Sequence, residues 1–220
     1  MTSVNPAIEA AIRQAAQEGG VDPAYAMAVA ERESAFNPTA RASKTIRGLY
    51  QMRGDLRQQY GVGDSDDALD QARGWVRSLQ DIRSDMSRVL GRDPTDEETY
   101  LGHHFGATRA ARSLGMDPNT PVEAVFTPQE MALNPHFGRA GTIGNLNSSV
   151  IGDIDRRMAR FGGDASAPSS TEPADLSAYG DPVAGSQPAD LSSFGDPVAA
   201  QQAQASSQPT DLSAFGTPAQ

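Results

Sequence analysis

The spacing of hydrophobic residues along the first three quarters of the chain is helical. Ile8, Ala11, Ile12 and Ala15 recur every three or four positions, which places them on one face of a helix. No stretch shows the convincing alternation of apolar and polar residues that a half-buried strand requires. We therefore expect residues 1–163 to form a mainly α domain.

Polar capping residues, prolines and glycines divide this pattern into separate helices. Asn5-Pro6 and Asp22-Pro23 each place a capping side chain ahead of a proline at the first turn, and Gly19-Gly20 separates the two. Thr127-Pro-Gln-Glu has the pattern of a capping box. After a second helix that ends near Asn37-Pro38, the expected helices cover residues 48–60, 68–90, 95–114 with a break near Gly106, a short segment from Thr127, and 146–161.

The composition changes sharply after Gly163. Residues 164–220 consist mainly of Ser, Pro, Ala, Gln, Gly and Asp, and the pattern Asp-Leu-Ser-x-Tyr/Phe-Gly begins at Asp175, Asp190 and Asp211. The unequal spacing argues against a solenoid, and one Leu with one aromatic ring per copy buries too little surface to offset the ordering entropy. We expect a disordered tail over residues 164–220.

Two interpretations of this tail stay open. It is either a solvating acidic linker that grew by duplication, or a docking segment whose three repeats each present an aromatic side chain to a virion or secretion-apparatus protein. Three weak sites on one chain would raise the overall avidity without any single strong contact.

Charge and composition exclude several classes of function. The net charge is −10, and seven of the 28 acidic residues but no Lys or Arg lie from Asp164 onward. With no interleaved run of aromatic and basic residues, we expect no nucleic-acid partner. The absence of cysteine excludes disulfides and thiolate chemistry, and three histidines at unsuitable spacing give no reason to expect a metal or cofactor. No apolar run approaches the roughly 18 residues of a membrane span, and the first residues do not form a secretory signal.

Glu33 is the best candidate for acid–base chemistry. Together with Ala26, Val29 and Ala30 it falls on one face of the second helix, at the C-terminal end of an otherwise apolar stripe, while Glu31 lies opposite. A carboxyl group against apolar surface near a helix C-terminus tends to keep its proton, as a general acid for glycosidic cleavage must. The same pattern also fits an ordinary polar residue before a turn, so periodicity alone does not decide.

Two short motifs favour the catalytic interpretation. Glu33-Ser-Ala-Phe-Asn-Pro38 is followed ten residues later by Gly48-Leu-Tyr-Gln-Met52. In this order and at this distance they resemble the soluble lytic transglycosylase family, with its Glu-Ser-x-Phe-x-Pro and Gly-Leu-Met/Phe-Gln motifs. The third family element, Tyr-Asn-Ala-Gly, is matched best by His103-His-Phe-Gly106, which resembles a Tyr-Leu-Ala-His-x-x-Gly variant and places His103 where the family usually has tyrosine. The resemblance covers about residues 5–115.

The resemblance implies a lysozyme-like fold and cleavage of the MurNAc–GlcNAc bond in peptidoglycan glycan strands, without a cofactor. Glu33 would protonate the leaving oxygen and then act as base for the C6 hydroxyl of MurNAc, which closes a 1,6-anhydro ring. Ser34 would orient the substrate or Glu33, and His103 either donates a hydrogen bond near Glu33 or packs without a special role. A sugar subsite would be lined by Gln51 and the backbone of Gly48, Leu49, Tyr50, Gln51 and Met52, where Gly48 leaves room for a sugar.

Two other functions remain open at this stage. The chain could be a hydrolase in which water attacks the sugar, or a murein-binding structural module without activity. We expect the setting to be a bacteriophage virion whose enzyme acts in the host periplasm and cell wall. The alternative is a bacterial enzyme exported by a dedicated secretion or flagellar apparatus.

Overall fold

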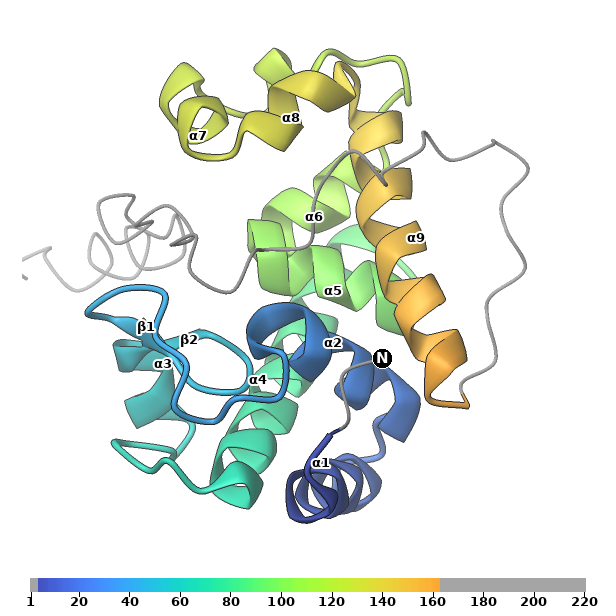
Figure 1. The fold of residues 1–220 in the computed structure, drawn as a ribbon. Helices are drawn as coiled ribbons and strands as arrows, with labels where there is room; N and C mark the ends of the chain where they lie inside the picture. The colour runs from blue at the N-terminus through green and yellow to red at the C-terminus, as the bar shows by residue number, and fades with distance from the viewer. Residues whose placement is uncertain (1–3, 163–220) are drawn as a thin grey trace, which may run out of the picture.

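Helices dominate the fold, as the hydrophobic spacing predicts (Figure 1). The computed structural model describes residues 4–162, so the predicted tail and its three repeats lie outside the described residues. No helix among the described residues is long and apolar enough to cross a membrane. The elements are α1 (Pro6–Glu18), α2 (Pro23–Ser34), β1 (Ile46–Arg47), β2 (Met52–Arg53), α3 (Gly54–Gln59), α4 (Ala68–Leu90), α5 (Asp96–Phe105), α6 (Ala107–Leu114), the 3-10 turn η1 (Val122–Ala124), α7 (Pro128–Leu133), α8 (Pro135–Ala140) and α9 (Ile143–Arg160).

The predicted capping residues begin their helices. The side chains of Asn5 and Asp22 accept hydrogen bonds from the backbone N–H groups of Ala7 and Ala24, at 2.9 and 2.7 Å. Thr127 forms the expected capping box with Glu130 at the start of α7. These bonds satisfy N–H groups that have no partner inside a helix, which explains why the starts could be located from sequence.

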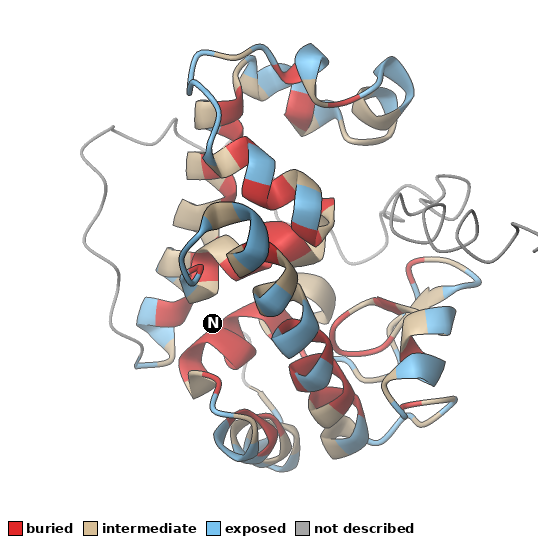
Figure 2. Cartoon of the chain, turned by 180° about the vertical axis from the view of Figure 1, so that it is seen from behind, coloured by how far each residue is buried: buried red, intermediate tan, exposed pale blue. Residues whose placement is uncertain are grey.

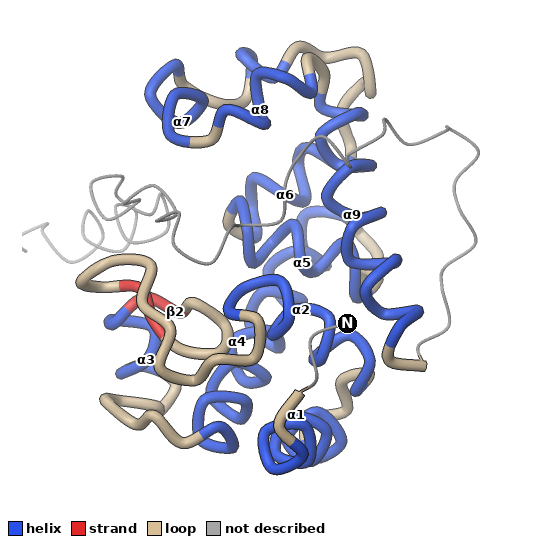
Figure 3. The backbone as a smooth tube through the Cα atoms, viewed as in Figure 1, coloured by secondary structure: helices blue, strands red, loops and turns tan. Residues whose placement is uncertain are grey.

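The prediction of a helix over residues 48–60 is wrong for residues 48–53, which are not helical. Gly48 and Gln51 have φ angles of +88° and +44°, a left-handed backbone that no α-helix contains. The chain instead turns back on itself, so that β1 and β2 pair antiparallel with Ile46 opposite Arg53, and only α3 is helical. This short hairpin, which Figure 3 shows within the long loop between α2 and α3, is compatible with the mainly α domain that the sequence predicts.

Other helix ends also differ from the prediction. α2 stops at Ser34 and not near Asn37, because Ala35 and Phe36 adopt left-handed conformations with φ of 49° and 65°. α8 was not predicted, and α9 begins at Ile143 with Thr142 as its cap, earlier than the predicted residue 146. The break at Gly106 between α5 and α6 is confirmed.

α2 is the central helix of the fold. Its residues 24–30 are all buried, and it packs against α1 on one side and α9 on another (Figure 2). α4 packs against α1 and α6, and its Trp75 is fully buried and stacked on Tyr50, with ring centroids 4.1 Å apart. The loop that carries Tyr50 is thereby fixed to the same core that holds α2.

Candidate functional site

Glu33 lies in the last turn of α2, partly buried, directly after the buried stretch of that helix. Its Oε1 accepts a hydrogen bond of 2.5 Å from the hydroxyl of Tyr100 on α5. Tyr100 is fully buried, and burial raises the pKa of its hydroxyl well above the usual range, so the group stays protonated and acts as a donor. The carboxyl group of Glu33 is therefore held in one orientation by a side chain of the core.

Arg32 fixes the other side of the Tyr100 hydroxyl. Its Nε donates to that oxygen at 2.6 Å, and its Nη1 forms an ion pair with Asp153 of α9. Because the hydroxyl oxygen accepts from Arg32, its own proton is directed toward Glu33. The result is a continuous chain of hydrogen bonds from Asp153 through Arg32 and Tyr100 to Glu33.

Tyr100 is not among the predicted site residues, and a hydrogen bond from His103 near Glu33 is one of two possibilities that the sequence leaves open. The donor to Glu33 is Tyr100, whereas the His103 ring lies on the next turn, with its centroid 5.7 Å from that of Tyr100. Burial lowers the pKa of His103, and the nearby charge of Glu33 opposes this shift. Residues three apart share a helix face, so this spacing could have raised Tyr100 as a second candidate. A role of His103 in substrate binding stays a prediction.

Ser34 and Glu31, which flank Glu33 in the helix, have structural partners. Ser34 Oγ donates to the carbonyl of Ala30 at 3.1 Å and accepts from the N–H of Asn37 at 3.2 Å, so it helps to end α2. Glu31 forms ion pairs with two arginines of α9, Arg157 and Arg160. The face of α2 that carries Glu31, opposite the apolar stripe, is therefore covered by α9.

The amide of Gln51 holds its own loop together. Its Oε1 accepts from the N–H of Ala42 at 3.1 Å, and its Nε2 donates to the carbonyl of Gly48 at 2.7 Å. A Cβ added to Gly48 would lie only 2.2 Å from Oε1 of Gln71. Gly48 is thus required by its left-handed backbone and by the packing of Gln71, which is a different reason from the predicted approach of a sugar.

The side chains of Leu49, Tyr50 and Met52 belong to the core. They are exposed by only 0, 1 and 4%, and the Tyr50 hydroxyl donates to the carbonyl of Ala26 at 3.3 Å. The predicted subsite uses the backbone of this segment together with Gln51, so the burial of these three side chains is compatible with that prediction and does not test it.

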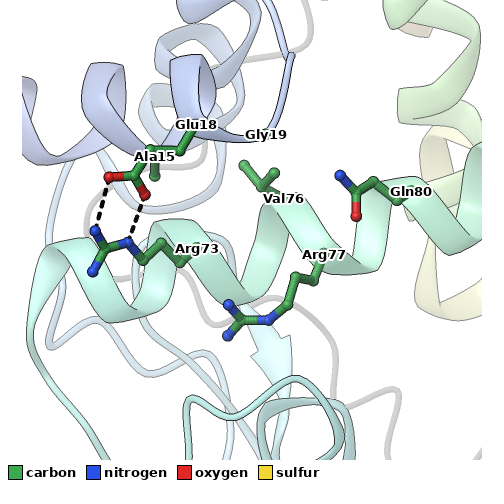
Figure 4. A pocket seen from close by; sticks show the side chains of 7 residues that line it. All are labelled: Ala15, Glu18, Gly19, Arg73, Val76, Arg77 and Gln80. Atoms are coloured by element: carbon green, nitrogen blue, oxygen red, sulfur yellow. Dashed lines mark hydrogen bonds and ion pairs between the residues drawn. The ribbon is translucent and has the colours of Figure 1, made fainter.

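Two surface hollows lie away from Glu33. One of about 410 Å³ is formed between α1 and α4 and contains a two-point ion pair between Glu18 and Arg73, at 2.7 and 2.8 Å (Figure 4). Another of about 260 Å³ is lined by Thr45, Arg53, Gly54 and Asp55. Glu18 is the one acid among the described residues that line the first hollow, and Arg73 neutralises it; Glu33 lines neither hollow.

Residues 4–162 contain no group of three or more His, Asp or Glu side chains arranged to hold a metal ion. The arrangement around Glu33 supplies a partly buried carboxyl group, oriented by the Tyr100 hydroxyl, that can donate and accept a proton.

Comparison with known proteins points to the same region. The chain is 28% identical over 128 residues to membrane-bound lytic murein transglycosylase F 2 of Alkalilimnicola ehrlichii, covering 54% of this chain and 28% of that protein. It is 27% identical over 109 residues to membrane-bound lytic murein transglycosylase F of Shewanella sediminis, covering 46% and 22%. The corresponding protein of Aeromonas salmonicida is 28% identical over 101 residues, covering 42% and 20%. This chain thus spans less than a third of the length of each relative.

The Transglycosylase SLT domain family matches residues 10–71, a segment that contains Glu33 and the whole of the loop from Gly48 to Met52. The mainly α architecture agrees with the lysozyme-like fold expected from the two motifs. Residues 10–71 are thus similar to the Transglycosylase SLT domain, and the three relatives share 27–28% identity with about half of this chain.

Proposed function

We propose that this chain is a lytic transglycosylase that cleaves the MurNAc–GlcNAc bond of peptidoglycan, with Glu33 as its general acid and base. The observation that carries the proposal is the partly buried Glu33 carboxyl group, fixed by the Tyr100 hydroxyl at the end of the central helix. The family match over residues 10–71 and the names of the three relatives support the substrate class.

The proposed reaction begins with Glu33 in its protonated form. Glu33 donates its proton to the glycosidic oxygen while the bond from that oxygen to C1 of MurNAc breaks, and GlcNAc leaves as the free alcohol. The Glu33 carboxylate then takes the proton of the MurNAc C6 hydroxyl as this oxygen bonds to C1. The products are a 1,6-anhydro ring and a reprotonated Glu33, with no water consumed. The Tyr100 hydroxyl would steady the carboxylate during the interval in which it is charged.

The surroundings of Glu33 support a mechanism with one carboxylate. Glycosidases that use two place the second one within about 5–10 Å of the first. Glu31, the acid two residues earlier in the same helix, is paired with Arg157 and Arg160 on α9, and Asp153 is paired with Arg32. A sugar hydroxyl as internal nucleophile requires no second carboxylate, whereas activation of water usually does.

Digestion of purified murein, followed by mass analysis of the products, tests this function. The wild-type chain should release fragments with anhydro ends, each one water lighter than a hydrolysed end. Glu33→Gln should release none, whereas Glu31→Gln, the same change two residues earlier, should retain cleavage. Hydrolysed ends would make the chain a hydrolase, and equal cleavage by Glu33→Gln would remove Glu33 from the mechanism. A wild-type chain that binds murein without cleaving it would be a binding module.

We further propose that Ser34, His103 and the backbone of residues 48–52 contact the glycan strand. His103 is the most direct test, because it shares a helix face with Tyr100 and its ring lies close to that residue. His103→Ala should raise KM for a soluble glycan strand, whereas an unchanged KM and kcat would dismiss the contact.

We propose a bacteriophage virion as the setting in which this activity would be delivered to the host cell wall. The support is the acidic, repeated segment 164–220, which suits attachment to a carrier assembly. Detection of the chain in purified virions would support this setting. Its absence from virions, together with release through a bacterial export apparatus, would replace it.

A further inference from the structure

The ion pair between Arg32 and Asp153 connects α9 to the end of the central helix. α9 (Ile143–Arg160) lies outside the segment that matches the SLT family, which ends at residue 71. Figure 1 shows α9 running along the side of the molecule next to α2 and α5. We propose that Asp153 is a positioning residue for the catalytic acid, acting on Glu33 through Arg32 and Tyr100. This inference rests on the function proposed above.

Each link in the connection is a direct contact. Asp153 Oδ2 accepts from Nη1 of Arg32, Nε of Arg32 donates to the Tyr100 hydroxyl at 2.6 Å, and that hydroxyl donates to Glu33 at 2.5 Å. Asp153 is itself held by Nε of Arg157, one helical turn later, at 3.2 Å. The Arg32 and Asp153 side chains are only 24 and 18% exposed, so their interaction is screened less than a surface pair.

Asp153 decides where the Arg32 guanidinium points. Arg32 and Glu33 are adjacent residues of opposite charge, so an Arg32 without another partner could turn toward the Glu33 carboxylate. Such a direct pair would neutralise the group that must exchange protons with the sugar. The Asp153 carboxylate accepts a hydrogen bond from Nη1 of Arg32. Because the guanidinium is planar, this contact directs the Nε–H of Arg32 toward the Tyr100 oxygen. The Tyr100 proton is thereby left to face Glu33.

A second ion pair between the same helices supplies an internal control. Glu31 on α2 binds Arg157 and Arg160 on α9, and its side chain is 17% exposed, close to the value for Asp153. Its ion-pair partners, Arg157 and Arg160, both lie on α9. If the acidic side chains only fasten α9 to α2, loss of either should have the same consequence. If Asp153 positions Glu33, only its loss should slow the reaction.

The experiment compares Asp153→Asn with Glu31→Gln in steady-state cleavage of a soluble glycan strand and in thermal unfolding. We expect Asp153→Asn to lower kcat about tenfold or more with KM changed less than about twofold, because misplacement of a reacting group acts mainly on the chemical step. Glu31→Gln should lower the melting temperature by a similar amount and leave kcat unchanged. Asp153→Glu, which retains a carboxylate, should recover part of the lost kcat.

Arg32→Lys keeps the positive charge but lacks the planar fork, so it should lose kcat in the same way as Asp153→Asn. It also provides the comparison if Asp153→Asn unfolds below the assay temperature. Equal kcat values for wild type, Asp153→Asn and Arg32→Lys would overturn the positioning role while leaving the proposed function intact. Equal losses of kcat in Asp153→Asn and Glu31→Gln would also overturn it. A wild-type chain that cleaves no glycan would instead refute the proposed function.

Discussion

The Tyr100 hydroxyl donates a hydrogen bond of 2.5 Å to Oε1 of Glu33, joining two residues 67 positions apart. Glu33 lies within the segment that matches the SLT family, and Tyr100 lies beyond it. The candidate site is therefore assembled from the central helix α2 and from α5, and its geometry depends on how these two helices pack.

Tyr100→Phe should reduce kcat for glycan cleavage about tenfold or more, because it removes the donor to Glu33 and keeps the buried ring. Steady-state kinetics on a soluble glycan strand measure this effect. Tyr25→Phe is the matched control, since Tyr25 is also fully buried and its hydroxyl makes no hydrogen bond among the described residues. A similar loss in both variants would assign the effect to the fold and not to Glu33.

Gly48→Ala should destabilise the chain more than Gly91→Ala. Both glycines have left-handed backbones, with φ of +88° and +70°, so both substitutions carry a conformational penalty of about 1–2 kcal/mol. Only at Gly48 would the new Cβ also meet Oε1 of Gln71, at 2.2 Å, whereas Gly91 has open space around it. Urea unfolding of the two variants measures the difference, and equal free energies of unfolding would contradict the collision.

Gln51→Ala should lower the free energy of unfolding by about 1–3 kcal/mol, because it leaves the N–H of Ala42 and the carbonyl of Gly48 without the bonds that the amide makes. Gln58→Ala, at an exposed position of α3, should change stability little. Denaturant unfolding compares the two. If Gln51→Ala kept full stability but lost glycan cleavage, its amide would belong to the substrate subsite and not to the loop.

Asp155 should make stability depend on pH between about pH 4 and 6. Burial, together with the neighbouring Glu97, raises the pKa of Asp155 from 3.8 to about 6. The folded chain holds the Asp155 proton more tightly than the unfolded chain does. The contribution of protonated Asp155 to the free energy of unfolding is therefore fully present at acid pH and is lost as the pH rises through 6. The side chain introduced by Asp155→Asn cannot ionise. The melting temperature of this variant should therefore rise relative to that of the wild type as the pH increases from 4 to 7.

The control for this titration is Asp66→Asn, which removes a carboxylate at an exposed position. Its melting curve should run parallel to that of the wild type over the same range. Parallel curves for Asp155→Asn as well would show that the ionisation of Asp155 is not linked to folding.

Helix starts and the catalytic candidate could be predicted from the sequence because both depend on local chemistry. Asp22 caps α2 through a bond to a backbone N–H two residues away, and Thr127 caps α7 in the same local manner. The placement of Glu33 after an apolar stripe follows from helical geometry alone. The motif around Glu33 and the one from Gly48 to Met52 carried the resemblance to a family without any knowledge of contacts.

The loop after α2 and the partners of Glu33 could be decided only by tertiary structure. The sequence pattern predicts a helix over residues 48–60. The chain instead makes left-handed turns at Gly48 and Gln51, which are set by the packing of Gln71 on α4 and by the hydrogen bond between Gln51 and the N–H of Ala42. Tyr100 and Asp153 stand 67 and 120 positions after Glu33, and no spacing rule relates residues that far apart. The sequence determined which carboxyl group could serve as the acid, whereas the packing of α5 and α9 onto α2 determined what holds it, because long-range contacts arise only when helices bury their apolar faces together.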